Sequence, residues 1–193
     1  MNKAVFIDKD GTLIKDISYN VNTTLIEFEL YAFEALQLLQ QLGYLLVVIT
    51  NQPGIAFDYF TEKELENVRV HISNMLKQKS IDLNGFYFCP HHVSGKLKAY
   101  AITCNCRKPA PGLLLKAASD MQIELADSWM IGDILNDVEA GNKAGCKTIL
   151  INNGNETEWQ TNDLRQPHYV VDNLMQAATI IATEKKIQKN ELG

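Results

Sequence analysis

Short, mostly apolar runs recur along the chain, separated by longer segments with apolar residues at helical spacing. The run from Tyr44 to Ile49 is continuously apolar and too short for a separate helix, which is typical of a strand covered on both faces in a parallel sheet. On the same pattern we expect further strands over residues 4–7, 85–88, 128–131 and 147–151, and a short edge strand over residues 169–171.

Helices are predicted between these strands. Gly43 suits the carboxyl end of the first helix, and Thr61 and Glu64 have the form of a capping box at the start of the second. Strands that alternate with helices indicate an α/β fold with a doubly wound, mainly parallel, Rossmann-like sheet. The expected helices cover residues 32–42, 61–79, 113–121, 135–144 and 174–187.

Length and composition fit one soluble domain. The chain has 193 residues, of which 46% are hydrophobic and 21% charged, and shows no linker or internal repeat. We expect a single domain over residues 1–193, with a tail that frays from about residue 185.

The net charge of −5 argues against general binding of nucleic acid or anionic membranes. No apolar run approaches the roughly 20 residues of a membrane helix, and the amino terminus lacks a signal peptide. We therefore expect a cytoplasmic protein, and a monomer.

Two acids, Asp8 and Asp10, follow the first predicted strand directly, and Gly11 allows the chain to turn there. Two carboxylates that lie this close repel each other unless a cation neutralises them or one is protonated. Mg²⁺ prefers oxygen ligands of this kind. The alternative interpretation is an ordinary turn after a strand.

Two other predicted strands end in the same way, at Thr50 and at Asp133. In open α/β sheets ligands bind beyond the carboxyl ends of the strands, so Asp8, Thr50 and Asp133 should share one crevice. A lone acid after a strand is often a helix cap, and Asp133 or Asp137 could be one. Three strands that end alike are harder to explain in that way.

Three of the four cysteines lie in one short region beside two histidines. In a reducing compartment this favours metal binding over a disulfide, whereas Cys146 is expected in the core. One imidazole and three thiolates match a closed tetrahedral Zn²⁺ site, which would be structural and would fix a loop over about residues 89–106. The candidate ligands are Cys89, Cys104, Cys106 and one of His91 and His92.

Four stretches together resemble, in chain order, the four motifs of the haloacid dehalogenase (HAD) superfamily of phosphohydrolases. They are residues 8–12, 50–52, 108–109 and 132–137, so that the resemblance covers the chain to about residue 178. Residues 50–56, 89–92 and 104–109 are similar, more narrowly, to the heptose-bisphosphate and histidinol-phosphate phosphatase branch.

The resemblance implies a role for each motif residue. Asp8 would attack phosphorus to give an aspartyl-phosphate, and Asp10 would act as general acid and base. The Asp8 and Asp133 carboxylates and the Asp10 backbone carbonyl would bind Mg²⁺. Thr50 would hydrogen-bond a phosphoryl oxygen and Lys108 would balance negative charge. Two further implications are that Asp137 orients the metal shell or Lys108, and that His91 rather than His92 completes the zinc site.

Arg107 offers a planar fork for a second phosphate or a sugar hydroxyl group, which favours a small bisphosphorylated sugar. We expect Asn51 and Gln52 to contact substrate as well. The branch implies removal of the 7-phosphate of D-glycero-D-manno-heptose 1,7-bisphosphate, toward ADP- or GDP-heptose for lipopolysaccharide. The alternatives are a histidinol-phosphate phosphatase, another small sugar-phosphate phosphatase and, in a different class, a non-catalytic sugar-phosphate-binding protein.

The spacing of the motifs also predicts the outline of the site. The interval between Asp8 and Thr50 is filled by a loop, a helix and a strand, which leaves no room for an inserted cap domain. We therefore expect a capless enzyme with an open cleft rimmed by loops. The branch usually has Ala-Arg-Gly after the second motif, whereas here Ala56 is followed by Phe57 and Asp58, which leaves the sugar and its anomer open.

Overall fold

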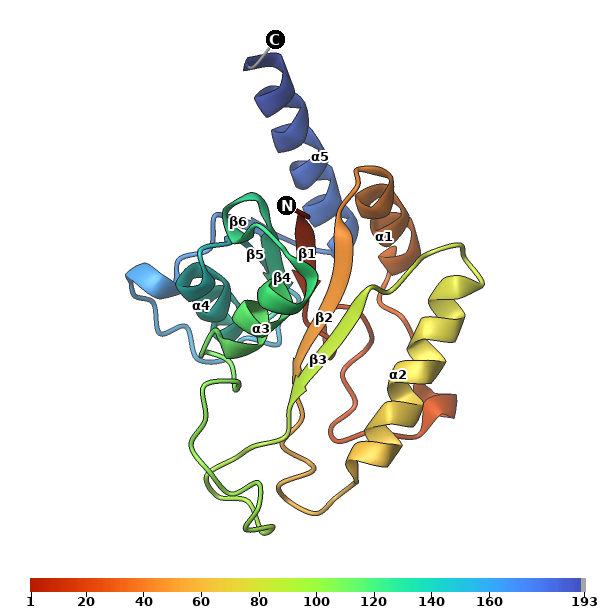
Figure 1. The fold of residues 1–193 in the computed structure, drawn as a ribbon, viewed down its shortest axis with the longest axis vertical. Coiled ribbons are helices and arrows are strands. Elements are labelled where there is room, and N and C mark those ends of the chain that lie inside the picture. Colours follow the sequence, from red (N-terminus) through yellow and green to blue (C-terminus); the bar gives the residue numbers. More distant parts are fainter. Residues whose placement is uncertain (192–193) are drawn as a thin grey trace.

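The computed structural model describes the backbone of residues 1–191 and the side chains of residues 1–187. Six parallel strands form one sheet in the order β3-β2-β1-β4-β5-β6, as Figure 1 shows. This confirms the doubly wound parallel sheet expected from the sequence. The strands are β1 (Ala4–Ile7), β2 (Leu45–Asn51), β3 (Gly85–Cys89), β4 (Trp129–Gly132), β5 (Lys147–Ile151) and β6 (Tyr169–Val171).

Helices connect successive strands and lie close to where the apolar periodicity predicts them. In α2 the Thr61 hydroxyl accepts from the Glu64 backbone N–H at 3.3 Å and the Glu64 carboxylate accepts from the Thr61 N–H at 2.8 Å, so the predicted capping box is present. The helices are α1 (Ala32–Gln41), α2 (Glu62–Lys77), α3 (Gly112–Met121), α4 (Leu135–Ala144) and α5 (Leu174–Glu191), with short 3₁₀ turns η1 (Thr23–Leu25), η2 (Leu125–Asp127) and η3 (Asp163–Arg165).

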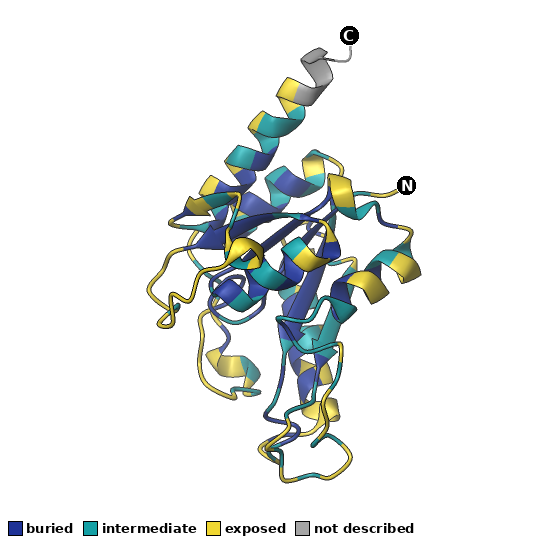
Figure 2. Ribbon diagram, turned by 90° about the vertical axis from the view of Figure 1, so that its left-hand side faces the viewer, coloured by how far each residue is buried: buried dark blue, intermediate teal, exposed yellow. Residues whose placement is uncertain are grey.

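The sheet is buried on both faces, which explains its continuously apolar strands. Val5 and Ile7 of β1 pack with α1, α2 and α5, while Ala4 and Phe6 point to the other face and pack with α3 and α4. Successive side chains of a strand alternate between faces, so each apolar run supplies both halves of the core. Figure 2 shows buried strands between helices whose outer surfaces are exposed.

β2 extends to Asn51, two residues beyond the apolar run that predicts it. Thr50 pairs with Phe88 and Asn51 pairs with Cys89 in the parallel ladder with β3. The pairing continues this far because β3 extends to Cys89. Cys89 is also one of the candidate zinc ligands. The second motif and the zinc loop therefore begin on adjacent strand ends.

Long loops follow β1, β2 and β3 and gather beyond the carboxyl ends of these strands, at the lower end of Figure 1. Within residues 1–191 the connections β1–β2 and β2–β3 contain one α-helix each and no inserted domain, which agrees with the capless architecture. None of the helices in the described part of the chain is long and apolar enough to span a bilayer. α5 continues past residue 185, and fraying of that tail stays a prediction.

Candidate active site and metal centre

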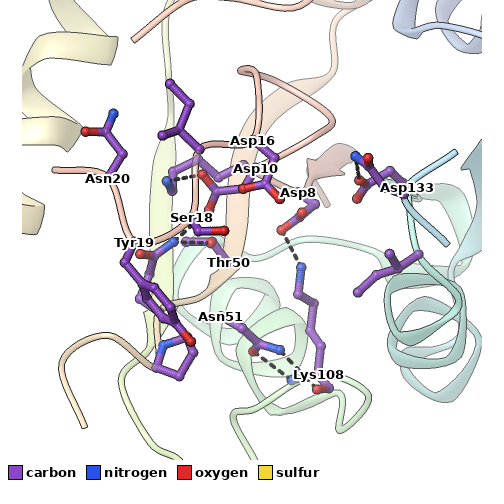
Figure 3. A pocket seen from close by; sticks show the side chains of 16 residues that line it. Asp8, Asp10, Asp16, Ser18, Tyr19, Asn20, Thr50, Asn51, Lys108 and Asp133 are labelled. Atoms are coloured by element: carbon purple, nitrogen blue, oxygen red, sulfur yellow. Dashed lines mark hydrogen bonds and ion pairs between the residues drawn. The ribbon is translucent and has the colours of Figure 1, made fainter. Parts of the chain in front are cut away.

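A cleft of about 320 Å³ lies beyond the carboxyl ends of β1, β2 and β4. In the observed strand order these three strands are neighbours, and the order reverses between β1 and β4, where α/β sheets bind ligands. Figure 3 shows polar side chains that converge on this cleft from strands far apart in the sequence. Seven predicted site residues line it: Asp8, Asp10, Thr50, Asn51, Gln52, Lys108 and Asp133.

Lys108 joins two carboxylates at the bottom of the cleft. Its Nζ lies 2.5 Å from Asp8 Oδ1 and 2.5 Å from Asp137 Oδ1, and it donates to the Ile49 carbonyl at 3.0 Å. Its side chain is only 3% exposed. Burial acts to lower the pKa of Lys108, but Asp137 and Asp8 outweigh it and raise this pKa. Lys108 is therefore a fixed positive charge beside the predicted nucleophile.

Burial raises the pKa of Asp8 well above its ordinary value, and Lys108 opposes this effect. Asp137, Asp133 and Asp10 add negative charge nearby and raise the pKa further. The surroundings of Asp8 thus hold more negative charge than Lys108 alone neutralises. A bound cation would remove this imbalance.

Asn51 fixes the backbone of Lys108. The Asn51 Nδ2 donates to the Lys108 carbonyl at 3.1 Å, and its Oδ1 accepts from the Lys108 N–H at 3.0 Å. The amide thus links the end of β2 to the loop that carries Lys108. We expected Asn51 to contact substrate; the observed contacts position Lys108, and the substrate contact stays a prediction.

Asp10 is held from two sides. Lys9 Nζ lies 2.5 Å from Asp10 Oδ1, and Gln52 Nε2 donates to Asp10 Oδ2 at 2.9 Å and to Thr50 Oγ1 at 2.8 Å. Lys9 is buried, whereas the Asp10 side chain is 30% exposed. Both oxygens of this carboxyl group therefore have hydrogen-bond partners, which fix it at the cleft.

Asp133 is bound by residues on two loops. Thr12 Oγ1 donates to its Oδ1 at 3.4 Å, and Asn155 Nδ2 donates to its Oδ2 at 2.7 Å. Burial, and next the charge of Asp137, raise the pKa of Asp133 to about 6, although the Asn155 hydrogen bond acts in the opposite direction. We did not predict Asn155 as a site residue. The only indication in the sequence is the polar run at residues 152–155.

Gly11 lies against Asp133. A Cβ on Gly11 would lie 2.1 Å from Asp133 Oδ2, and the backbone φ of Gly11 is +79°. Both the close approach and the left-handed backbone require glycine here. The turn after β1 therefore brings the first motif against the fourth.

The acids of the cleft fit a hard divalent cation. Asp8, Asp133 and Asp137 each offer an oxygen, and these oxygens all lie within 4.8 Å of one another. Buried, mutually repelling carboxylates are the donor set that Mg²⁺ neutralises. Asp8 and Asp133 belong to the predicted ligand set, and the Asp10 carbonyl remains a predicted third ligand. Asp137 also contacts Lys108, which is one of the two roles that the HAD resemblance implies for it.

The raised pKa of Asp133 predicts that Mg²⁺ binding weakens in acid. This pKa is about 6 in the folded, metal-free protein and 3.8 for a free aspartate side chain. As pH falls, Asp133 therefore takes up its proton at a higher pH in the folded state than in the unfolded state. Asp133 therefore destabilises the metal-free fold at pH 7 relative to pH 5, and a cation competes with its proton at pH 5. Titration calorimetry should give an affinity about tenfold lower at pH 5 than at pH 7.5. Equal affinities at the two pH values would contradict this prediction.

The four predicted zinc ligands lie together in the zinc loop. The donor atoms of Cys89, His91, Cys104 and Cys106 all lie within 4.8 Å of one another. His91 presents Nδ1, at 3.2 Å from Cys106 Sγ and 3.7 Å from Cys89 Sγ. All four cysteines of the chain are free thiols. Burial raises the pKa of Cys89 and Cys106, so these thiols need a cation to ionise, and the set fits Zn²⁺.

We predict about one tightly held zinc per chain, measured by elemental analysis of the purified protein. Cys104→Ser should lose this zinc and lower the Tm by about 5 °C or more, since about 2 kcal/mol of lost stability has this effect in a chain of this size. Cys146→Ala is the matched control, because Cys146 is a buried thiol just before β5 that is not in the ligand group, and its zinc content should not change. Wild-type protein without zinc would refute the assignment.

Two other predicted residues have different surroundings. The His92 ring packs against Phe57 with centroids 4.8 Å apart, and His92 is not in the group of clustered zinc ligands. Arg107 donates to the His91 carbonyl at 3.5 Å and is not among the side chains that line the cleft. Its predicted contact with a second phosphate stays a prediction.

The loop after β1 also lines the cleft, and its individual residues were not predicted. We expected a loop between β1 and α1, and no periodicity there marks any side chain. The structure brings one segment of this loop to the cleft: Asp16, Ile17, Ser18, Tyr19 and Asn20.

Comparison with known proteins adds three likenesses. A model of the HAD-hydrolase-like family matches residues 105–177. The D-glycero-β-D-manno-heptose-1,7-bisphosphate 7-phosphatase of Pasteurella multocida is 39% identical over 183 residues, which cover 94% of this chain and 97% of that protein. The protein of the same name from Haemophilus influenzae is 36% identical and covers 96% of this chain and 100% of its own length.

A solved structure is also similar to this chain. The D,D-heptose 1,7-bisphosphate phosphatase from B. bronchiseptica, complexed with magnesium and phosphate, has a TM-score of 0.80 at 26% identity, over 95% of this chain and 99% of that chain.

Proposed function

Because the chain belongs to the HAD-like phosphatase family of the D-glycero-β-D-manno-heptose-1,7-bisphosphate 7-phosphatases, we propose that it removes the 7-phosphate of this sugar bisphosphate in a Mg²⁺-dependent reaction. The observation that carries the proposal is the group Asp8–Lys108–Asp137 at the bottom of the cleft. It offers a carboxylate nucleophile and a buried positive charge at one point. The β anomer is proposed from the names of the relatives.

Asp8 attacks phosphorus in this proposal, and an aspartyl-phosphate forms as the sugar leaves. Lys108 holds the Asp8 carboxylate from one side and remains available to the negative charge that builds up on the phosphoryl group. The carboxylate is accessible, since Asp8 lines the cleft. Bound Mg²⁺ would reduce the repulsion between Asp8 and the anionic substrate.

Asp10 moves the protons. The protonated carboxyl group of Asp10 gives its proton to the leaving sugar oxygen. The carboxylate that this leaves then takes a proton from the water that hydrolyses the intermediate, which restores the protonated form. Gln52 and Lys9 fix its carboxyl group at the edge of the cleft, and the bond from Gln52 also ties it to Thr50. Thr50 is buried at the end of β2, where its hydroxyl can donate to a phosphoryl oxygen.

A comparison of substrates tests the proposal. Phosphate release should be fastest with the β anomer of D-glycero-D-manno-heptose 1,7-bisphosphate, slower with the α anomer, and slower still with histidinol phosphate and other sugar phosphates. EDTA should abolish release and Mg²⁺ restore it. Preference for histidinol phosphate would overturn the proposed substrate, and failure of every phosphate ester would favour a sugar-phosphate-binding protein.

We further propose that the protein works as a monomer in the cytoplasm, on the way to an activated heptose. The small sugar substrate of the relatives and the acidic net charge support this setting. Gel filtration with light scattering measures the mass directly against 21.7 kDa for one chain.

A further inference from the structure

The loop that follows β5 reaches the acids of the cleft from a part of the chain that carries none of the four motifs. We call residues 152–156 the asparagine loop. Asn155 Nδ2 donates to Asp133 Oδ2 at 2.7 Å, and Asn155 is among the residues that line the cleft of Figure 3. Because Asp133 belongs to the predicted Mg²⁺ ligands, the asparagine loop contacts the metal site through a ligand.

The neighbours of Asn155 in the asparagine loop fix its position. Asn153 Nδ2 donates to the Gly11 carbonyl at 2.7 Å, and Asn153 Oδ1 accepts from the Asn155 backbone N–H at 3.1 Å. One amide thus joins the turn after β1 to the backbone of Asn155. On the other side, Glu156 Oε2 accepts from the Leu135 N–H at 2.6 Å, at the start of α4. The loop is therefore held on both sides of Asn155.

Gly11 leaves room for the hydrogen bond between Asn155 and Asp133. A Cβ on Gly11 would lie 2.5 Å from Asn155 Nδ2 and 2.1 Å from Asp133 Oδ2. Nonbonded heavy atoms do not approach this closely, so a side chain at residue 11 would displace one or both partners of the bond. Gly11, Asp133 and Asn155 are thus packed as one unit, which joins three loops at the metal site.

A neutral donor suits the charge of this site. Asp8, Asp133 and Asp137 bring three carboxylates together, and Lys108 brings one positive charge. The excess of two negative charges is what one divalent cation balances. The amide of Asn155 can orient the Asp133 carboxylate without neutralising it, so the full excess stays available to the metal.

Asn155 provides the shorter of the two hydrogen bonds that hold the Asp133 side chain. Thr12 Oγ1 lies 3.4 Å from Asp133 Oδ1, which is long for a hydroxyl donor, whereas the Asn155 bond measures 2.7 Å. Mg²⁺ demands near-ideal octahedral geometry, so a carboxylate that is already oriented binds it better than one that must be ordered on binding. Hydrogen-bond partners of metal ligands act in this way.

We propose that Asn155 is a positioning residue that orients the Asp133 carboxylate for Mg²⁺, and that Asn153 holds Asn155 in place. The inference rests on the Mg²⁺ requirement of the proposed function. Asn155 acts through Asp133, so its loss weakens metal binding and removes no group that breaks or forms a bond. Coupling of this kind is reciprocal, so bound Mg²⁺ in turn stabilises the asparagine loop.

Mg²⁺ binding to the purified, metal-free protein tests the proposal by titration calorimetry. Asn155→Ala should lower the Mg²⁺ affinity about tenfold and Asn153→Ala about threefold, within or below the range usual for partners of metal ligands. Asn155→Gln keeps an amide donor and should lower the affinity less than Asn155→Ala does. The loss of phosphate release in Asn155→Ala should be large at low Mg²⁺ and small at saturating Mg²⁺.

Hydrogen exchange gives a second measurement that needs no substrate. Mg²⁺ should slow exchange of the backbone amides in residues 152–156 of the wild-type protein, and should slow it less in Asn155→Ala. Asn152→Ala is the matched control, because Asn152 is an exposed asparagine of the same loop whose backbone N–H donates to the Val171 carbonyl at 2.8 Å. Its Mg²⁺ affinity should equal that of wild type. Thermal unfolding in EDTA reports whether each variant is folded.

The outcomes separate this inference from the proposed function. An unchanged Mg²⁺ affinity in Asn155→Ala, or an equal loss in Asn152→Ala, would overturn the role of Asn155 and leave the proposed function standing. Wild-type protein that binds Mg²⁺ but hydrolyses no phosphate ester would overturn the proposed function alone. Wild-type protein that binds no Mg²⁺ would overturn both.

Discussion

Asp8→Asn will lower kcat by about 10⁴-fold or more, because an amide cannot form the acyl-phosphate intermediate, and loss of a nucleophile has effects of this size in covalent enzymes. The substitution keeps the shape of the side chain and removes one of several clustered negative charges. The metal-free variant should therefore be folded and at least as stable as wild type. Phosphate release and thermal unfolding in EDTA check the two parts of the prediction.

Asp82→Asn provides the control for Asp8→Asn. Asp82 is an exposed acid that pairs with Lys77 on the surface, and such pairs contribute little to stability. Its activity should be unchanged. Turnover by Asp8→Asn at the wild-type rate would exclude the aspartyl-phosphate route, even if the substrate assignment held.

Lys108→Met will lower kcat by about 10²–10³-fold and also destabilise the fold. Lost activity follows from removal of a buried charge beside the reacting group. Lost stability follows because Asp8 and Asp137 are left close together without their shared cation, and breaking a buried ion pair in this way costs about 3–5 kcal/mol. Denaturant unfolding in EDTA should show the full loss, and Mg²⁺ should reduce it.

A double variant separates these two effects. Lys108→Met with Asp137→Asn removes one of the stranded carboxylates, so it should recover much of the stability and none of the activity. Lys116→Met is the surface control, because Lys116 pairs with the exposed Asp120 on α3. Activity restored by the double variant would mean that Lys108 acts only through the fold.

The parts of the site that could be predicted from sequence lie on strand ends. Asp8, Thr50 and Asp133 follow apolar runs, and a parallel sheet brings the carboxyl ends of such runs to one edge. Whether these three residues lie close together also depends on the strand order, in which β1 lies between β2 and β4. The HAD motifs implied this arrangement, which the apolar periodicity alone leaves open.

Lys108 is a different case, because it follows no strand and has no periodic neighbours. Its place in the site came from the resemblance, and the structure gives the physical reason in the two hydrogen bonds between Asn51 and the Lys108 backbone. Those bonds span 57 residues and occupy both ends of the amide. No local pattern reveals a contact over such a separation.

Asn155 and Tyr19 could not be predicted, since both lie in loops without periodicity. Asn155 reaches Asp133 from the loop after β5, 22 residues along the chain. Tyr19 is placed by aromatic neighbours on a different loop. Loops of this kind derive their shape from contacts with other loops, so a polar run such as residues 152–155 indicates a loop without showing which side chain reaches the site.

β1 precedes the other described strands and lies in the interior of the sheet, with β2 on one side and β4 on the other. β1 ends at Ile7 and β4 begins at Trp129, so a nascent chain must add more than one hundred further residues before β1 can be paired on both edges. Until then one edge of the strand that leads to Asp8 has no hydrogen-bond partners, and the Asp8 carboxylate has no lysine until residue 108 emerges. The catalytic centre is thus assembled late in translation, and a fragment that ends before β4 lacks both the strand that completes the sheet and Asp133.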